Sequence, residues 1–250
     1  MTARAVGRSV RLYHQPARRP LLDAFHARFL GPGDLAFDVG AHVGDRTLSF
    51  RRLGARVVAV EPQPALLRAL RLILRNDPGV TLVPALLGAA EGEALLHLNR
   101  ANPTVATASR EFIAAAAGAP GWEGQEWGAA LPRRRTTLDA LAAAHGRPHF
   151  IKVDVEGWEA EVLAGLSSAP RALSFEFTTI QRLVAHACLA RLGALGLAAF
   201  NACLGENMEW AFPAPVGAAE MAAWLDALPA EANSGDIYAS SEPARLRVAG

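Results

Sequence analysis

The sequence predicts an α/β fold in which a mostly parallel sheet carries helices on both of its faces. Short apolar runs that are typical of buried strands alternate with segments in which leucine recurs at helical spacing. An order of strand, helix, strand, helix and strand builds a parallel sheet. With 250 residues the chain is long enough for one sizeable core, and it shows neither an internal repeat nor a clean domain boundary. We therefore expect a single domain over residues 21–250, preceded by an N-terminal arm over residues 1–20.

The first half of the chain shows the clearest alternation. The basic segment up to Pro20 has no regular pattern, and the helical spacing that begins at Leu21 ends before a turn with the sequence GPGD. The apolar runs LAFDV and RVVAV predict buried strands, and spaced leucines predict the helix that begins at Pro64. The elements expected in this half are helices at 21–30, 45–53 and 64–76 and strands at 35–39, 56–60 and 80–86.

Two irregular segments, near residues 99–135 and 205–234, interrupt the second half of the chain. The first contains several glycines, prolines and tryptophans, and such a long loop inside a compact domain is typically a functional cover or a flexible insert. The alternation continues around both segments. The elements expected here are strands at 94–98, 150–155, 172–177, 197–202 and 236–240 and helices at 157–166 and 180–195.

Composition and charge exclude several classes of function. The formal net charge of +1 gives no electrostatic sign of a nucleic-acid partner. The N-terminus lacks the apolar core of a signal peptide, and no uncharged apolar stretch reaches the ~18 residues of a membrane span. We therefore expect a soluble, cytoplasmic protein with no membrane partner.

Neither the cysteines nor the histidines are spaced like metal ligands. Cys188 and Cys203 also lack the density of a disulfide scaffold, and they are expected to be small buried hydrophobic residues. His145, His149 and His186 have no acidic partner at a ligand spacing, so we expect no catalytic metal.

The segment FDVGAHVGD, from Phe37 to Asp45, joins the first expected strand to the following helix. Parallel sheets bind nucleotide-like ligands outside the carboxyl ends of their strands, beside a helix N-terminus. Glycine there lets the backbone approach the ligand. Asp38 suits an ammonium group, and the two carboxylate oxygens of Glu61 suit a pair of vicinal ribose hydroxyls. The residues expected to contact a bound cofactor are Asp38, Gly40, Ala41, His42, Gly44, Glu61, Pro62 and, farther along the chain, Asp154, with the adenine near Ala85 and Leu86.

A nicotinamide dinucleotide is the nearest alternative ligand for this loop. Its fingerprint is G-x-G-x-x-G, followed about 20 residues later by an acidic residue. Here the two glycines are Gly40 and Gly44, so the close glycine pair that accommodates a pyrophosphate is missing. Asp38 would be an unfavourable neighbour for a diphosphate, whereas it suits the amino group of S-adenosylmethionine. For His42, a solvated loop position is as consistent with the sequence as a ligand contact.

A second acidic segment, FIKVDVEGWE, follows the expected strand at 150–155. Asp154 and Glu156 are candidates for orienting an acceptor hydroxyl or removing its proton. Lys152 is the only lysine of the chain, which suggests that its compact ammonium matters. Glu156 and Glu159 also flank a helix start, where the helix dipole alone favours negative charge. Glu176, in the sequence SFEF, is a further candidate at the ligand edge.

Taken in order, the motifs FDVGAHVGDRTLSF, VVAVEP, TTLDAL, IKVDVEGWEAEVLAGL and SFEF closely resemble the FkbM family of methyltransferases. They span about Phe37 to Phe177, and DIYAS resembles the terminal strand of that family. The stretch 99–135 departs from the family pattern, because a serine-rich turn is replaced by Thr104, Thr107 and Ser109.

The resemblance implies a class I, Rossmann-like fold: a mostly parallel, seven-stranded sheet flanked by helices. It implies S-adenosylmethionine as donor and O-methylation of a hydroxyl on a small-molecule acceptor, a sugar or a natural product. Asp154, Glu156 and Lys152 are then the expected catalytic residues, because the fourth strand of this fold ends beside the transferable methyl group. Two alternatives stay open: a methyltransferase-fold binding module without catalysis, and a nicotinamide-dependent oxidoreductase.

Overall fold

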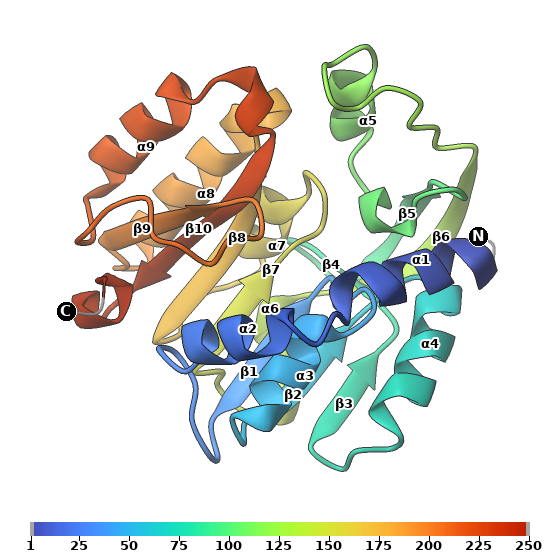
Figure 1. The fold of residues 1–250 in the computed structure, drawn as a ribbon, viewed down its shortest axis with the longest axis horizontal. Coiled ribbons are helices and arrows are strands. Elements are labelled where there is room, and N and C mark those ends of the chain that lie inside the picture. Colours follow the sequence, from blue (N-terminus) through green and yellow to red (C-terminus); the bar gives the residue numbers. More distant parts are fainter. Residues whose placement is uncertain (1–2, 249–250) are drawn as a thin grey trace.

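The computed structural model describes residues 3–248 and places helices on both faces of a central sheet (Figure 1). Within these residues the sheet has seven strands in the order β3-β2-β1-β7-β8-β10-β9. Strand β10 runs antiparallel to its neighbours β8 and β9, and all the other pairs of neighbouring strands are parallel. The mostly parallel, seven-stranded sheet is therefore confirmed. Its strands are β1 (Leu35–Val39), β2 (Arg56–Val60), β3 (Val80–Val83), β7 (Phe150–Val153), β8 (Ala172–Thr178), β9 (Ala199–Leu204) and β10 (Ser234–Ser240).

The helices cover the sheet in two groups because successive strand residues point to opposite faces. On β1, Leu35, Phe37 and Val39 belong to a core shared with α6 to α9. Ala36 belongs to a second core, shared with α2, α3 and α4 on the other face. The α-helices are α1 (Ala3–Tyr13), α2 (Arg18–His26), α3 (Asp45–Arg52), α4 (Pro64–Leu74), α5 (Arg110–Ala116), α6 (Leu138–His145), α7 (Glu159–Ala164), α8 (Arg182–Ala194) and α9 (Ala218–Ala227).

A second, three-stranded sheet lies beside the central one and corrects two predictions. It consists of β4 (Leu86–Leu87), β6 (Ala129–Thr136) and β5 (Gly92–Leu98), in that order. The strand expected over residues 80–86 therefore ends at Val83, and its last residue pairs in the other sheet. The part of 99–135 that forms β6 was expected to be irregular, because its sequence AALPRRRT shows no apolar alternation. Antiparallel pairing with β5 over seven residues gives it strand conformation.

Four α-helices were not predicted. The expected arm over residues 1–20 contains α1 and the first turn of α2, and the segments 99–135 and 205–234, expected to be irregular, contain α5 and α9. The fourth is α6, at Leu138–His145. In α1 only Ala5 and Ser9 are buried, so the helix carries no stripe of large apolar residues that the sequence could reveal. Helix α1 contacts α4 and the short 3₁₀ turn η1 (Pro103–Val105).

The remaining 3₁₀ turns connect or close the larger elements. They are η2 (Thr179–Gln181), η3 (Ala230–Ala232) and η4 (Pro243–Leu246).

Among the residues that the structure describes, no helix is both long and apolar enough to span a lipid bilayer.

Candidate active site

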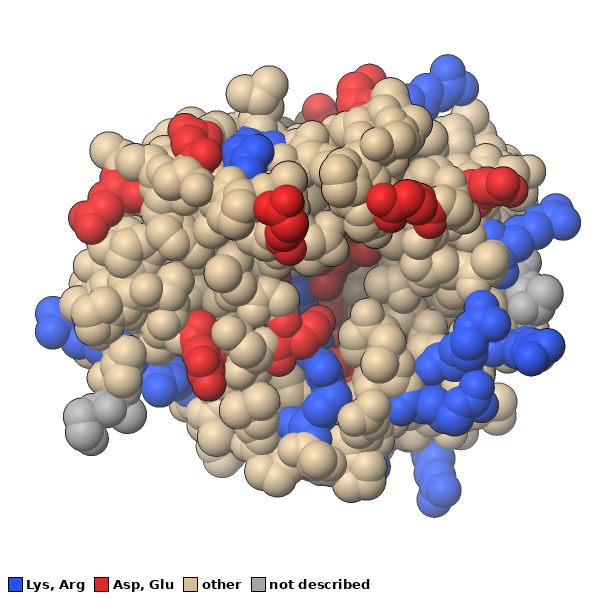
Figure 2. All heavy atoms as spheres, turned by 45° about the horizontal axis from the view of Figure 1, so that its top comes forward, with Lys and Arg blue, Asp and Glu red and all other residues tan. Residues whose placement is uncertain are grey.

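A cleft of about 960 Å³, partly open to solvent, lies at the carboxyl ends of β1, β2, β7 and β8. The strand order reverses between β1 and β7, which is where open α/β sheets bind their ligands. Figure 2 shows the hollow in one face of the molecule, with acidic side chains at its floor and rim.

The register of three neighbouring strands brings the predicted residues together. Val39 of β1 pairs with Val60 of β2 on one side and with Val153 of β7 on the other. The residues that directly follow these three positions, Gly40, Glu61 and Asp154, therefore lie at one level of the sheet. Of the predicted cofactor residues, those that line the cleft are Asp38, Gly40, Ala41, His42, Glu61, Pro62, Ala85, Leu86 and Asp154.

Gly44 is the one predicted cofactor residue that does not line the cleft. It precedes α3 with a φ of 81°, and a Cβ atom there would lie 2.7 Å from Cδ2 of Leu70. The helix start and the packing of Leu70 therefore account for this glycine. Gly40 also has a positive φ, 87°, and faces protein, because a Cβ atom would lie 1.7 Å from the carbonyl oxygen of Asp154. Both glycines therefore shape the loop, and Gly40 also lines the cleft.

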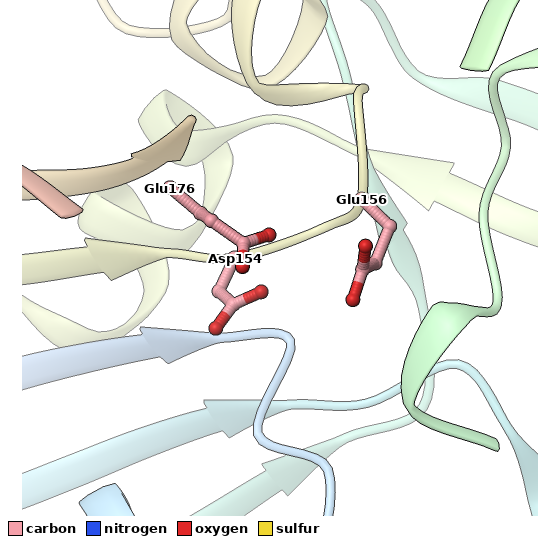
Figure 3. Close-up of side chains that lie close together, drawn as sticks. All are labelled: Asp154, Glu156 and Glu176. Carbon is pink, nitrogen blue, oxygen red and sulfur yellow. The ribbon is translucent and has the colours of Figure 1, made fainter. Parts of the chain in front are cut away.

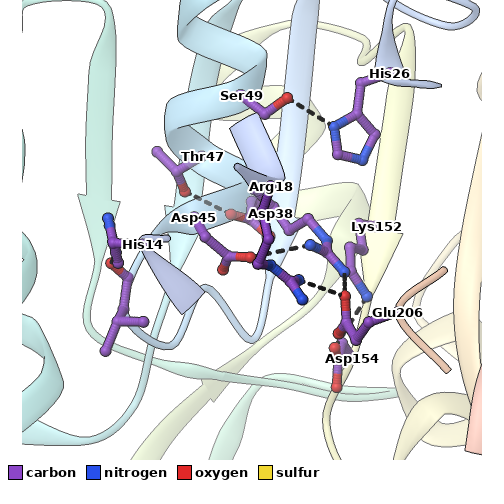
Figure 4. A network of polar contacts seen from close by, with 12 residues as sticks. His14, Arg18, His26, Asp38, Asp45, Thr47, Ser49, Lys152, Asp154 and Glu206 are labelled. Atoms are coloured by element: carbon purple, nitrogen blue, oxygen red, sulfur yellow. Dashed lines mark hydrogen bonds and ion pairs between the residues drawn. The ribbon is translucent and has the colours of Figure 1, made fainter. Parts of the chain in front are cut away.

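Asp38 is 2 % exposed and sits in the floor of the cleft. The hydroxyl of Thr47, on the first turn of α3, donates a hydrogen bond to Oδ2 of Asp38 (Figure 4). Burial raises the pKa of Asp38 to about 6, although the hydrogen bond from Thr47 and the nearby Lys152 ammonium oppose the rise. A cationic ligand would stabilise the ionised form.

Glu61 is 2 % exposed and accepts one backbone hydrogen bond on each carboxylate oxygen. Oε2 accepts from the N–H of His42 at 2.9 Å, and Oε1 accepts from the N–H of Gln63 at 2.7 Å. These bonds fix the carboxylate and leave further acceptor positions on both oxygens. Burial raises the pKa of Glu61 to about 8, against the two backbone donors that lower it.

Gln63 was not predicted from the sequence, although it lines the cleft beside Glu61. Its Nε2 donates to the carbonyl oxygen of Pro103 at 3.0 Å, which fixes the orientation of the amide. Its Oε1 is buried and has no hydrogen-bond partner in the described chain, so a buried acceptor faces the cleft. The neighbouring wall is mainly apolar, formed by Ala85, Leu86, Leu87, Leu96, Ala106 and Ala108.

Lys152 is 3 % exposed and is paired with two carboxylates. Its Nζ lies 2.9 Å from Oδ2 of Asp154 and 3.1 Å from Oδ1 of Asp236. Burial by itself lowers the pKa of Lys152, but Asp154 and Asp236 outweigh it and hold the pKa well above its usual value. Asp236 was not predicted; the signal was an acidic residue in the otherwise uncharged strand SGDIYAS.

Three carboxylates meet on the side of the cleft formed by β7 and β8. Asp154 and Glu156 follow β7, and Glu176 lies in β8 (Figure 3). One oxygen of each lies within 4.8 Å of an oxygen of the other two. Burial and then the charge of Asp154 raise the pKa values of Glu156 and Glu176 well above the usual range.

The backbone at Glu156 is strained, with a φ of 59° that non-glycine residues rarely adopt. The hydroxyl of Thr107 donates to the carbonyl oxygen of Glu156 at 2.6 Å and holds this conformation from the 99–135 segment. Glu159 supports the same loop, because its Oε1 accepts from the N–H groups of Val155 at 3.0 Å and Gly157 at 3.2 Å. Glu159 does not line the cleft, so its observed contacts are those of a structural cap.

The N-terminal helix contributes to the cleft, which the sequence did not reveal. Tyr13 of α1 lines it and contacts the His42 ring edge-on, with centroids 5.2 Å apart. Nε2 of His14 makes a 2.9 Å hydrogen bond with the carbonyl oxygen of Val43. Nε2 of His42 is buried without a partner in the described chain, so the histidine is not simply solvated.

An ion-pair network ties the N-terminal segment to the loop after β9. Glu206 accepts from Arg18 at 2.8 Å and also from Arg46, which in turn pairs with Asp45 (Figure 4). Burial by itself raises the pKa of Glu206, but the two arginines outweigh it and lower the pKa to about 2. Asp45, Arg46 and Glu206 line the cleft.

The four tryptophans of the two irregular segments lie outside the cleft lining. Trp122 and Trp127 pack around Phe112, whereas Trp210 contacts Phe25 and Trp224 contacts Phe177. Packing of those segments onto the body accounts for all four. Trp158, by contrast, lines the cleft and donates from Nε1 to the carbonyl oxygen of Leu87 at 3.1 Å.

Comparison with solved structures gives methyltransferases of low sequence identity. Precorrin-6Y C5,15-methyltransferase from Geobacter metallireducens is 15 % identical with a TM-score of 0.43, over 91 % of this chain and 89 % of that chain. A TehB-like SAM-dependent methyltransferase from Corynebacterium glutamicum is 9 % identical with a TM-score of 0.45, and the match covers 89 % of this chain and 88 % of that chain. Fibrillarin from Aeropyrum pernix, with natively bound S-adenosyl-L-methionine, is 14 % identical with a TM-score of 0.41, and the match covers 84 % of this chain and 67 % of that chain.

A search of curated protein sequences gave no significant match. A profile of the methyltransferase FkbM domain matches residues 38–187, which is more than half of the chain. The matched stretch begins at Asp38 and includes Glu61, Asp154 and Glu176. The chain therefore belongs to the FkbM family of S-adenosylmethionine-dependent methyltransferases.

Proposed function

We propose that this methyltransferase transfers the methyl group of S-adenosylmethionine to a hydroxyl of a small-molecule acceptor, a sugar or a natural product. The observation that carries the proposal is the position of Asp154. Asp154 directly follows β7, and it lines the same cleft as Asp38 and Glu61. The carboxylates of Glu156 and Glu176 lie beside its own. A hydroxyl is a weak nucleophile until its proton is removed, and these are carboxylates of the type that remove protons.

The donor side of the cleft fits S-adenosylmethionine. Asp38 would hold the ammonium group, the loop from Gly40 to His42 would line the methionine moiety, and Glu61 would bind the ribose hydroxyls. Glu61 suits this role because its backbone bonds fix both oxygens without exhausting their acceptor capacity. The apolar wall with Ala85 and Leu86 would take the adenine, with the buried Oε1 of Gln63 nearby to accept from an amino group.

When bound, S-adenosylmethionine supplies a methyl group on a sulfonium sulfur, which keeps the electron pair of the broken C–S bond. The residues on the acceptor side would orient a hydroxyl in line with that bond, since positioning is the main contribution to a direct displacement. Asp154 or Glu156 would take the proton of the hydroxyl as the new O–C bond forms. Lys152 would act as a positioning residue, because it holds Asp154 through Oδ2 and leaves Oδ1 directed elsewhere.

The test of the donor site is calorimetric titration with S-adenosylmethionine and S-adenosylhomocysteine. Wild-type protein should bind both, and Asp38→Ala should abolish binding of the two ligands. Asp34→Ala is a suitable control, since Asp34 lies at the opposite end of β1. No binding by a folded wild-type protein would overturn the donor-site assignment.

The test of catalysis follows S-adenosylhomocysteine release with a panel of sugar and natural-product hydroxyls. Asp154→Asn and Glu156→Gln should keep cofactor affinity and lose turnover. A binding module is the alternative that remains: it would bind S-adenosylmethionine and yield no product with any acceptor. Wild-type turnover in both variants would show that neither carboxylate is the base.

A further inference from the structure

Glu156 and Glu176 form an acidic cluster with Asp154, and of the three carboxylates only that of Asp154 accepts a hydrogen bond within the described residues. Glu156 is 6 % exposed, and its carboxylate has no hydrogen bond or ion pair within residues 3–248. Oε2 of Glu176 is buried and also has no partner there. Buried carboxylates in proteins are normally paired, hydrogen-bonded or coordinated to a metal. The described chain itself supplies these two carboxylates with neither a hydrogen-bond donor nor an ion-pair partner.

The nearby basic side chains are already paired with other acids. Lys152 forms ion pairs with both Asp154 and Asp236. Its single ammonium group is therefore already shared by two carboxylates, neither of which belongs to Glu156 or Glu176. Arg46 pairs with Asp45 and Glu206. The cluster therefore has fewer cationic partners than carboxylates.

The cluster also has the geometry of a cation site. One oxygen from each of Asp154, Glu156 and Glu176 lies within 4.8 Å of the other two, and Figure 3 shows the three carboxylates turned toward a common space. Oxygens that bind one Mg²⁺ or Ca²⁺ at ~2.0–2.6 Å lie up to roughly 5 Å apart across the ion. Asp154 can take part through Oδ1, because Lys152 occupies only Oδ2.

We propose that Asp154, Glu156 and Glu176 bind one hard divalent cation, Mg²⁺ or Mn²⁺, at the acceptor end of the cleft. The donor set consists of carboxylate oxygens, without the histidine or cysteine ligands that favour zinc. This assignment differs from the sequence-based expectation of no catalytic metal. The three proposed ligands come from the ends of two different strands, so they have no recognisable spacing in the sequence.

The role of the cation rests on the proposed function. Three protein ligands leave coordination positions open, and an acceptor hydroxyl bound there would lose its proton more readily. Each carboxylate gives the cation one oxygen, so the second oxygen of Glu156 stays available to take that proton. The acceptor oxygen then bonds to the methyl carbon, and the C–S electron pair remains on sulfur as S-adenosylhomocysteine.

Cation binding can be measured without turnover, by titrating chelator-treated full-length protein with Mn²⁺ and following the electron paramagnetic resonance signal of free Mn²⁺. Wild-type protein should bind one equivalent, and Mg²⁺ should compete for the site. Glu156→Gln and Glu176→Gln should each weaken Mn²⁺ binding by roughly ten-fold or more, since the loss of even an outer-shell partner of a metal ligand costs that much. Glu161→Gln, which changes an exposed acid of α7, is the matched control and should bind like the wild type.

Parallel calorimetry with S-adenosylhomocysteine separates this proposal from the proposed function. Normal nucleoside binding without stoichiometric Mn²⁺ binding would overturn the cation site alone. Mn²⁺ binding that survives both glutamine substitutions would also overturn it, because the ion would be elsewhere. Stoichiometric Mn²⁺ binding that needs both glutamates, in a protein that binds no nucleoside, would support the cation site and overturn the donor-site assignment.

Discussion

Gly40 approaches Asp154 so closely that a Cβ atom on residue 40 would lie 1.7 Å from the Asp154 carbonyl oxygen. The contact joins the loop after β1, which carries the proposed donor residues, to the end of β7, which carries the proposed base. The loop with the proposed donor residues is therefore packed directly against the backbone that carries the proposed base.

Gly40→Ala tests this contact. The new methyl group cannot fit at 1.7 Å, and the φ of 87° is itself unfavourable for alanine. We expect loss of S-adenosylmethionine binding together with a reduced free energy of unfolding, measured by calorimetry and urea denaturation. Gly33→Ala provides the control for backbone strain alone, since its φ is 84° and nothing lies within 4 Å of the added Cβ. Equal effects of the two substitutions would show that the Asp154 contact is unimportant.

The affinity for S-adenosylmethionine should rise with pH. Burial raises the pKa of Glu61 to about 8 and that of Asp38 to about 6, so both carboxyls are protonated in the free protein at low pH. The proposed ammonium and ribose contacts favour the ionised forms, which means that binding below pH 8 releases protons. Calorimetry from pH 6 to pH 8 should give a falling Kd, and the heat should depend on the ionisation enthalpy of the buffer.

Asp38→Asn keeps an acceptor for Thr47 and removes one titrating group from this process. Its pH dependence should be shallower around pH 6 than that of the wild type. A Kd for the wild-type protein that does not change between pH 6 and pH 8 would contradict the proposed contacts.

Lys152→Met should destabilise the fold. It removes the ammonium between Asp154 and Asp236 and leaves buried carboxylates without their counterion. Breaking a buried ion pair in this way costs about 3–5 kcal/mol. Urea denaturation should show this loss, and adding Asp236→Asn should restore part of it because the most buried unpaired charge is removed. A double variant no more stable than Lys152→Met would contradict the pairing with Asp236.

Glu206→Gln should lower stability at neutral pH and not at strongly acidic pH. The folded-state pKa of Glu206 is about 2, below its ordinary value of 4.5, because Arg46 and Arg18 favour the ionised form. The ion pairs therefore stabilise the fold above pH 4.5, and this contribution disappears as the pH falls toward 2. The difference in Tm between wild type and Glu206→Gln should follow that course. Glu209→Gln, on the same loop and without an ion pair among the described residues, should behave like the wild type at each pH.

Much of the central sheet was predictable because its strands are short apolar runs with clear local boundaries. The run LAFDV became β1 and RVVAV became β2, with the same bounds as expected. The candidate residues Asp38, Glu61 and Asp154 could be found in the same way, since each lies at the carboxyl end of such a run. The motifs around them also carried the resemblance to the FkbM family, which the profile match confirms.

Other elements could not be read from local pattern. The sequence AALPRRRT forms β6 because β5 pairs with it, and α1 forms a helix with only two small residues buried. Residues Leu86–Leu87 pair with β6 rather than extending β3, which moves part of an expected strand into another sheet.

By itself the sequence determined the α/β class, the family and the carboxylates at the ends of the parallel strands, because these depend on residue type and short-range spacing. Only the tertiary structure decided which carboxylates share a space. Glu176 and Asp236 reach Asp154 and Lys152 through the pairing of β8 with β7 and β10. Register between strands distant in sequence is set by packing of the whole sheet, and no local periodicity encodes it.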